Sequence, residues 1–80
     1  MENSLDPDSG EPLYLQLLAI LREQITSGQL VGRVPSAKTL TQEYGPGRAT
    51  TQRVLTMLAE DGLIKASIGK GYYTVRKDKG

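Results

Sequence analysis

Residues 35–62, PSAKTLTQEYGPGRATTQRVLTMLAEDG, contain two apolar patterns of helical spacing separated by a Gly-Pro-Gly turn. Ser36 can cap a short helix that buries Leu40. Residues 45–47 cannot continue it, because proline disfavours helical geometry in its predecessor and glycine is costly inside a helix. A longer helix over residues 48–61 follows. Its expected buried face comprises Val54, Leu55 and Leu58. This order predicts a helix-turn-helix.

The flanking sequence adds one helix and a hairpin. Upstream, apolar residues at spacings of three and four predict a helix between Pro12 and Gly28. They are Tyr14, Leu17, Leu18, Leu21 and Ile25. Downstream, residues 63–66 and 72–75 predict two strands joined by a tip, and we expect the hairpin to lie against the helices because a lone hairpin is marginal in water. The predicted fold class is α+β, mainly α: a winged helix-turn-helix, three helices followed by a two-stranded β-hairpin wing.

The chain of 80 residues is long enough for one domain. We predict a disordered leader over residues 1–10, because they are polar and contain Pro and Gly. The winged domain is predicted over residues 11–76, and residues 77–80 are a tail or the start of a linker. The N-terminus lacks the pattern of a signal peptide and no apolar run is long enough to span a membrane, so we expect a cytoplasmic protein with no membrane partner.

Composition argues against an enzyme. The chain has no cysteine and no histidine, so it lacks thiolate metal ligands and the commonest general base. The acidic residues Glu43, Glu60 and Asp61 have no companion base in so small a chain. We therefore predict no catalytic residue, no metal and no cofactor.

Charge is distributed unevenly along the chain. Residues 1–11 contain four acidic residues and no basic ones, so the other 69 residues carry +5, from ten basic and five acidic residues. Nine of the ten basic residues lie from Arg33 onward, at Arg33, Lys38, Arg48, Arg53, Lys65, Lys70, Arg76, Lys77 and Lys79. A basic second half suits a polyanionic partner, although scattered Lys and Arg are also ordinary surface residues.

The start of the predicted third helix carries residue types that suit contacts with DNA. Its first residues are Arg48, Ala49, Thr50, Thr51, Gln52 and Arg53. Guanidinium groups can bind guanine or phosphate, an amide can read adenine, hydroxyls can bind phosphate, and a methyl group suits thymine. We expect Arg48, Thr51, Gln52 and Arg53 to be available to solvent, at a helix N-terminus that itself favours an anion.

Residues 12–75 resemble the DNA-binding domain of the GntR family of bacterial regulators. Five motifs occur in the family's order: PLYLQL at 12–17, LREQITSGQL at 21–30, VPSAKTLTQEYG at 34–45, GRATTQRVLTMLAEDGLI at 47–64 and GKGYYTV at 69–75. The PLY opening and the tyrosine before Gly45 look most like the branch typified by the histidine-utilisation repressor.

The resemblance implies roles for individual residues. Ser36 and Lys38 start the second helix and would touch the DNA backbone or base edges. Arg48 matches the family's most characteristic base-reading arginine. Thr50 matches a hydroxyl that contacts phosphate, and Gln52 falls where a second basic reader is common.

In the wing, Gly69 matches a tip glycine that lets the backbone reach the minor groove, and Lys70 and Gly71 lie beside it.

Three departures from the family pattern affect the turn and the third helix. Gly47 replaces a Ser or Thr that could cap the helix, Pro46 replaces an apolar residue that helps to pack the turn, and Thr51 also replaces an apolar residue.

The function predicted from these features is sequence-specific binding of double-stranded DNA by a repressor. The recognition helix, residues 48–61, would enter the major groove, and the wing, residues 67–72, would lie at the minor groove. The resemblance also implies a homodimer on an inverted-repeat operator, and a small-molecule effector that binds a domain outside these 80 residues. The alternative is a winged helix used for protein–protein contacts, which would need an apolar exposed face on the third helix.

Overall fold

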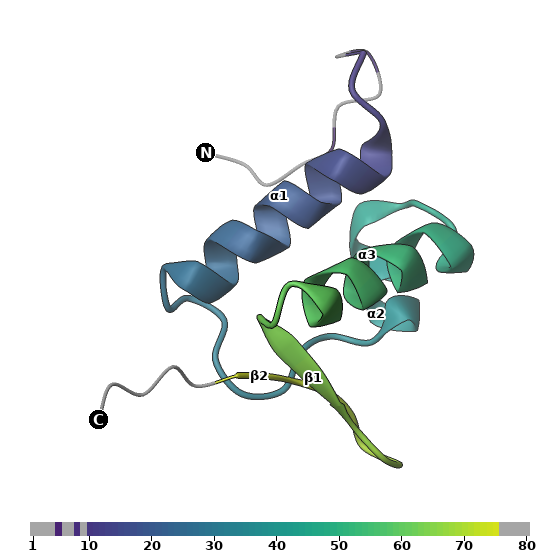
Figure 1. The fold of residues 1–80 in the computed structure, drawn as a ribbon. Coiled ribbons are helices and arrows are strands. Elements are labelled where there is room, and N and C mark those ends of the chain that lie inside the picture. The colour runs from purple at the N-terminus through teal and green to yellow at the C-terminus, as the bar shows by residue number, and fades with distance from the viewer. Residues whose placement is uncertain (1–4, 6–7, 9, 76–80) are drawn as a thin grey trace.

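The computed structural model describes residues 5, 8 and 10–75, and Figure 1 shows their arrangement. The elements are α1 (Leu13–Thr26), α2 (Ala37–Tyr44), α3 (Arg48–Glu60), β1 (Ile64–Ser67) and β2 (Gly71–Thr74). This confirms the predicted winged helix-turn-helix. The third helix ends one residue before the predicted Asp61, which is its C-cap, and the hairpin tip is shorter than predicted, because Ser67 and Gly71 pair as strand residues.

Local chemistry explains where the helices begin and end. The Ser36 hydroxyl accepts a hydrogen bond from the Thr39 backbone N–H at 3.2 Å, so the predicted cap of α2 is confirmed. Gly45 ends α2 in the left-handed region, with φ of 103°, which a residue with a Cβ rarely adopts. Pro46 is buried, so it packs the turn although it departs from the family pattern.

The core lies between the three helices and the start of β1. Its buried apolar residues are Leu17, Leu18, Leu21, Val34, Leu40, Val54, Leu55, Leu58 and Ile64. The predicted inward residues of α3 are all among them, whereas Tyr14 and Ile25 of α1 are partly buried at the margin. α3 contacts α1, α2 and β1, so it is the element around which the others pack.

The wing is attached to the helices through the connector between α1 and α2. β1 and β2 pair antiparallel, with Ile64 opposite Thr74. On the other edge of β2, the Val34 N–H donates to the Tyr72 carbonyl at 2.9 Å, and the Thr74 N–H donates to the Gly32 carbonyl at 2.9 Å. The connector therefore acts as a short third strand, and it supports the hairpin that we expected to lie against the helices.

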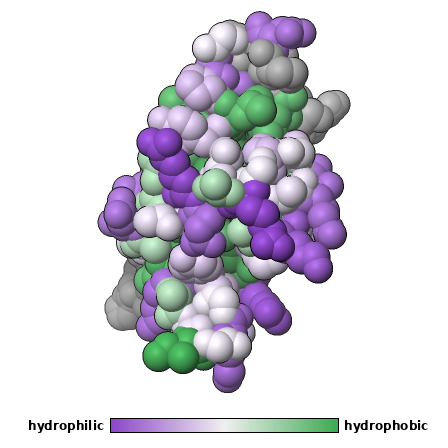
Figure 2. Space-filling model, turned by 90° about the vertical axis from the view of Figure 1, so that its right-hand side faces the viewer, coloured by the Kyte–Doolittle hydropathy of each residue, from purple (hydrophilic) through white to green (hydrophobic). Residues whose placement is uncertain are grey.

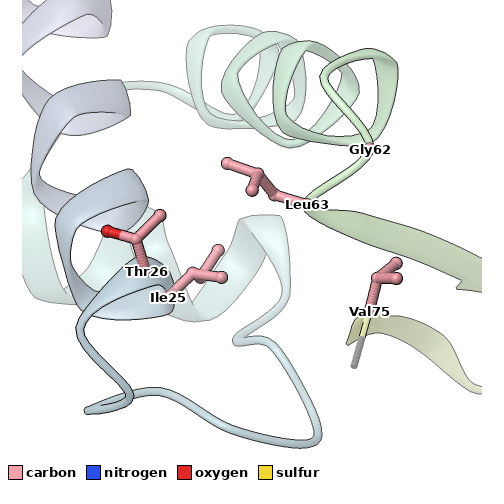
Figure 3. Close-up of a pocket in the computed structure, with 5 residues that line it drawn as sticks. All are labelled: Ile25, Thr26, Gly62, Leu63 and Val75. Carbon is pink, nitrogen blue, oxygen red and sulfur yellow. The ribbon is translucent and has the colours of Figure 1, made fainter. Parts of the chain in front are cut away.

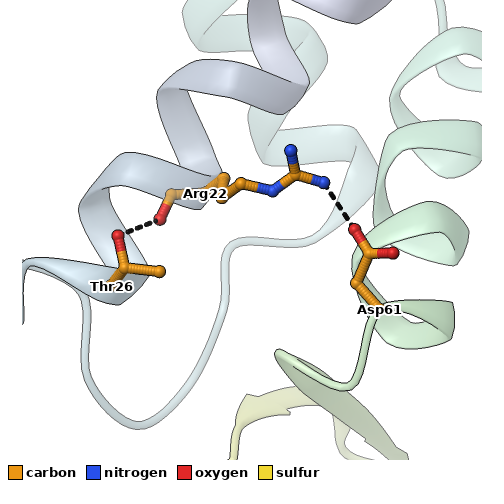
Figure 4. A network of polar contacts seen from close by, with 3 residues as sticks. All are labelled: Arg22, Thr26 and Asp61. Atoms are coloured by element: carbon orange, nitrogen blue, oxygen red, sulfur yellow. Dashed lines mark hydrogen bonds and ion pairs between the residues drawn. The ribbon is translucent and has the colours of Figure 1, made fainter.

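The C-terminal ends of α1 and α3 are joined on the surface. The Arg22 guanidinium forms an ion pair with the Asp61 carboxylate, and the Thr26 hydroxyl donates to the Arg22 backbone carbonyl at 2.9 Å (Figure 4). The side chains of Arg22 and Asp61 are 47% and 46% exposed, so solvent screens the pair. It orients the two helix ends and contributes little to stability.

The predicted leader and tail fall mostly outside the described residues. Within the leader, Leu5 is partly buried and packs against the core, so this residue of the predicted disordered segment has a defined place. Arg76 and the predicted tail, residues 77–80, lie outside the described part of the chain. Among the helices of residues 5, 8 and 10–75, we find none with the length and apolar character that crossing a membrane requires.

The inward stripe of α3 predicts unequal effects of two substitutions in that helix. Leu58→Ala should lower the free energy of unfolding by about 2–5 kcal/mol, because Leu58 is fully buried and its loss leaves a cavity. Thr56→Ala, on the exposed side of the same helix, should change it by about 0.5 kcal/mol or less. Urea unfolding of both variants measures the difference, and equal losses would contradict this assignment of the two faces.

Candidate nucleic-acid interface

The N-terminal part of α3 presents a polar face to solvent. Arg48, Ala49 and Gln52 are exposed and Thr50 is half-buried. Arg48 and Gln52 are four residues apart and so share one side of the helix. The first backbone N–H groups of a helix have no intrahelical acceptor, and within Arg48–Glu60 no acidic residue occupies the first turn. This end of α3 is therefore suited to an anionic partner.

Thr51 does not belong to that exposed face, and the expectation that it is available to solvent is wrong. Its side chain is fully buried. The Thr51 hydroxyl lies 3.2 Å from the Ala37 carbonyl, 3.1 Å from the Arg48 carbonyl and 3.3 Å from the Thr41 hydroxyl. The position follows from helical periodicity, because Thr51 begins the stripe that continues through Val54, Leu55 and Leu58. Its hydroxyl joins α2 to α3.

Arg53 is exposed but has a partner on another helix. Its guanidinium carbon lies 4.3 Å from the centroid of the Tyr14 ring in α1, which is a cation–π contact. Arg53 follows Arg48 by five residues, so it emerges from a different side of α3. The structure therefore separates Arg53 from the Arg48 and Gln52 face. Sequence gave no sign of this contact, because Tyr14 and Arg53 are far apart in the chain.

The start of α2 contributes a cap and a cation. The Ser36 hydroxyl accepts from the Thr39 N–H and also donates to the Thr39 hydroxyl at 3.1 Å, so its own hydrogen-bonding capacity is largely used inside the protein. Lys38, two residues later, is exposed. Of these two predicted site residues, Lys38 has the freer side chain for an external partner.

The tip of the wing is a tight, open turn. The Lys70 N–H donates to the Ser67 carbonyl at 2.9 Å, and Gly69 has φ of 75°, which suits the third position of a type II turn. Gly71 also has positive φ, and apart from the adjoining residues no atom lies within 4 Å of where a Cβ would be at Gly69 or Gly71. Lys70 is exposed and Ile68 is 100% exposed. The three predicted wing residues thus lie together at an accessible backbone.

Two residues at this interface were missed in the sequence analysis as site candidates. Arg33 is exposed, and its backbone pairs with that of Tyr73 as a single antiparallel β-bridge. It also lines a hollow together with Ser36 and Gln52. Only the pairing of the connector with β2 brings it there. The exposure of Ile68 could have been predicted from the sequence, because an apolar residue in a hairpin tip has no core to enter.

Gln52 and Tyr72 connect α3 with the wing. The Gln52 side-chain N–H donates to the Tyr72 hydroxyl at 3.1 Å. Tyr72 is partly buried and packs against the core, so the hydroxyl is presented from a supported ring. This bond brings the amide that is predicted to read bases to the junction of α3 and the wing.

The surface agrees with a polar partner on this side. Figure 2 views the molecule from the side on which α3 begins, and strongly hydrophilic side chains lie across the middle of that face among residues of intermediate hydropathy. A separate hollow lies at the other end of α3, lined by Ile25, Thr26, Gly62, Leu63 and Val75 (Figure 3). Its lining is mainly apolar, and none of these five residues is an acid or a base.

Comparison with protein families agrees with the resemblance seen in the sequence. The family model described as bacterial regulatory proteins, gntR family, matches residues 13–74.

Two curated relatives are transcription regulators. An uncharacterized HTH-type transcriptional regulator of Rhizobium meliloti is 36% identical over 72 residues, which cover 88% of this chain and 30% of that protein. The mannosyl-D-glycerate transport/metabolism system repressor MngR of Escherichia coli is 34% identical over 65 residues, covering 79% of this chain and 27% of that protein. The chain thus spans less than a third of each of these relatives. Both of these relatives are named as regulators of transcription, and neither is named as an enzyme.

A solved structure supports the fold. The AraR DNA-binding domain, in complex with operator ORE1, superposes with a TM-score of 0.77 at 22% identity, covering 94% of each chain.

The buried hydroxyl of Thr51 leads to a prediction about stability. Thr51→Val should change the free energy of unfolding by about 1 kcal/mol or less, because the Ala37 and Arg48 carbonyls lie in helices and keep their backbone partners. Thr51→Ala should lower it by about 1–2 kcal/mol, since it also leaves a small cavity. Thermal unfolding compares both variants with the unaltered protein, and a Val variant that loses as much stability as the Ala variant would show that the hydroxyl, which both variants lack, matters more than the cavity.

Proposed function

The chain belongs to the GntR family of bacterial regulatory proteins, and on that premise we propose that it binds double-stranded operator DNA in a sequence-specific manner. α3 enters the major groove with its N-terminus leading, and the wing lies along the neighbouring minor groove. The observation that carries the proposal is the two-sided character of α3. One side is fully buried, and the opposite side presents Arg48 and Gln52 at a helix start free of acidic residues.

Within this arrangement the residues divide by role. Arg48 and Gln52 read base edges, and Ala49 and Thr50 contact a thymine methyl group or phosphate. Ser36 holds the start of α2 and Lys38 contacts phosphate there. Thr51 acts from inside the protein, through the contact between α2 and α3. Arg53, which lies on Tyr14, approaches the backbone from the side of α1.

The wing contributes contacts that do not depend on base sequence. Gly69 and Gly71 allow the backbone to approach the minor groove closely, and Lys70 supplies charge beside them. Arg33, in the strand-like connector, adds a second cation next to the wing.

The finer functional assignments rest on the family and on relatives. We propose that the full-length protein is a repressor that binds an inverted repeat as a homodimer, in the cytoplasm where the bacterial chromosome lies. A small-molecule effector would act through a further domain. The MngR repressor and the AraR domain bound to an operator support the repressor and operator parts of this proposal. The PLY opening and Tyr44 support the branch of the histidine-utilisation repressor.

The rival function, a protein-docking winged helix, would need an apolar exposed surface on α3. The exposed residues of α3 are Arg48, Ala49, Gln52, Arg53, Thr56 and Glu60, and only the small Ala49 among them is apolar. This composition favours DNA over a protein partner.

Binding should depend strongly on salt. Each phosphate that the protein neutralises should lower the logarithm of the association constant by about 0.9 per logarithmic unit of salt. Fluorescence anisotropy with a duplex at several salt concentrations gives the slope. An affinity independent of salt would contradict DNA binding through Arg48, Lys38 and Lys70.

Arg48 and Lys70 should differ in what they contribute. Arg48→Ala should weaken binding to the preferred duplex by about 1–3 kcal/mol and relax the preference at one base pair. Lys70→Ala should weaken binding to preferred and random duplexes alike and reduce the salt slope by about one unit. Titration of both variants against both duplexes separates these roles. Equal losses on the two duplexes for Arg48→Ala would remove Arg48 as a base reader.

A further inference from the structure

The hydrogen bond between Gln52 and Tyr72 joins the two elements that approach different grooves of DNA. Gln52 is exposed on α3, and its Nε2 lies 3.1 Å from the Tyr72 hydroxyl on β2. Both residues line a hollow that they share with Arg33 and Ser36. An exposed glutamine ordinarily samples several rotamers, so a bond to a ring packed on the core restricts where its amide can lie.

The bond leaves the amide able to read a base. A primary amide has two N–H donors and one carbonyl acceptor, and the Tyr72 hydroxyl uses one donor. The remaining N–H and the Oε1 atom are the pair that bidentate recognition of adenine requires, with the N–H donating to N7 and Oε1 accepting from N6. The Tyr72 hydroxyl is the acceptor in this bond, so its own O–H can still donate to another partner.

Orientation in advance has a physical benefit. Glutamine is among the side chains that lose most rotamer freedom when they are ordered. A side chain already held in the free protein loses less conformational entropy on binding, which strengthens the binding. Only a base that can pair with the amide in its held orientation benefits from this stronger binding. Tyr72 can therefore raise discrimination without touching the base.

We propose that Tyr72 is a positioning residue for base reading by Gln52, and that through it the wing contributes to specificity in the major groove. The preferred partner of the held amide is adenine. This inference rests on the proposed function, because it names a specificity determinant within the same DNA-binding site.

The strand provides a matched control. Tyr72 and Tyr73 are neighbours in β2, and alternate residues of a strand point to opposite faces. Tyr72 packs against the core, whereas among residues 5, 8 and 10–75 no side chain forms a hydrogen bond with the Tyr73 hydroxyl. Tyr72→Phe and Tyr73→Phe each remove one hydroxyl and keep the ring, but only the first removes the partner of Gln52.

The test selects bound duplexes from a library of randomised DNA, for the unaltered protein, Tyr72→Phe, Tyr73→Phe, Gln52→Ala and the double variant Gln52→Ala with Tyr72→Phe. We expect Gln52→Ala to abolish one adenine preference. Tyr72→Phe should weaken that same preference by about three- to tenfold and leave the position read by Arg48 unchanged. Tyr73→Phe should alter neither. In the double variant, loss of the Tyr72 hydroxyl should have no further effect on this preference.

A second measurement does not depend on DNA. In NMR spectra of the free protein, Tyr72→Phe should shift the side-chain amide signals of Gln52, and Tyr73→Phe should leave them in place. Unmoved signals in Tyr72→Phe, or a preference that falls equally at every position, would overturn the positioning role while leaving the proposed function standing. Failure of the unaltered protein to enrich any sequence would overturn the proposed function and this inference together.

Discussion

The inward stripe of α3, formed by Thr51, Val54, Leu55 and Leu58, is the constraint on which the rest of the structure depends. These side chains are at most 1% exposed, and they hold α3 against α1, α2 and the start of β1. Because the rotation of α3 is set by this packing, the residues on its other side have a defined direction. The exposure of Arg48 and Gln52 is thus a consequence of core formation, not a property of those residues alone.

The attachment of the wing follows from the same core. Val34 is buried among the helices, and its N–H binds the Tyr72 carbonyl, so one residue joins the hydrophobic core and the edge of the hairpin. Two short strands would be marginal alone, and here they are supported on one edge by the connector. The distance between the wing tip and the start of α3 is therefore set by packing, which suits a site that spans two grooves.

The polar groups at the interface are also held by partners within the protein. Ser36 caps α2, Arg53 lies on Tyr14, and Gln52 bonds to Tyr72. Each contact reduces the freedom of a side chain that lies near the proposed DNA surface. Arg48 and Lys70 are exposed cations on this proposed surface, and cations there suit a polyanionic partner.

Local sequence was enough to place the helices, the Gly45 turn, the Ser36 cap and the hairpin, because caps, turns and apolar periodicity act over a few residues. Local sequence also led us to predict that the start of α3 contacts DNA. Tertiary packing decided what local patterns do not contain: Thr51 is buried between two helices, Arg53 meets Tyr14, and the connector brings Arg33 beside the wing. Those contacts join residues distant in the chain, so they depend on how the elements pack and not on the sequence around each residue.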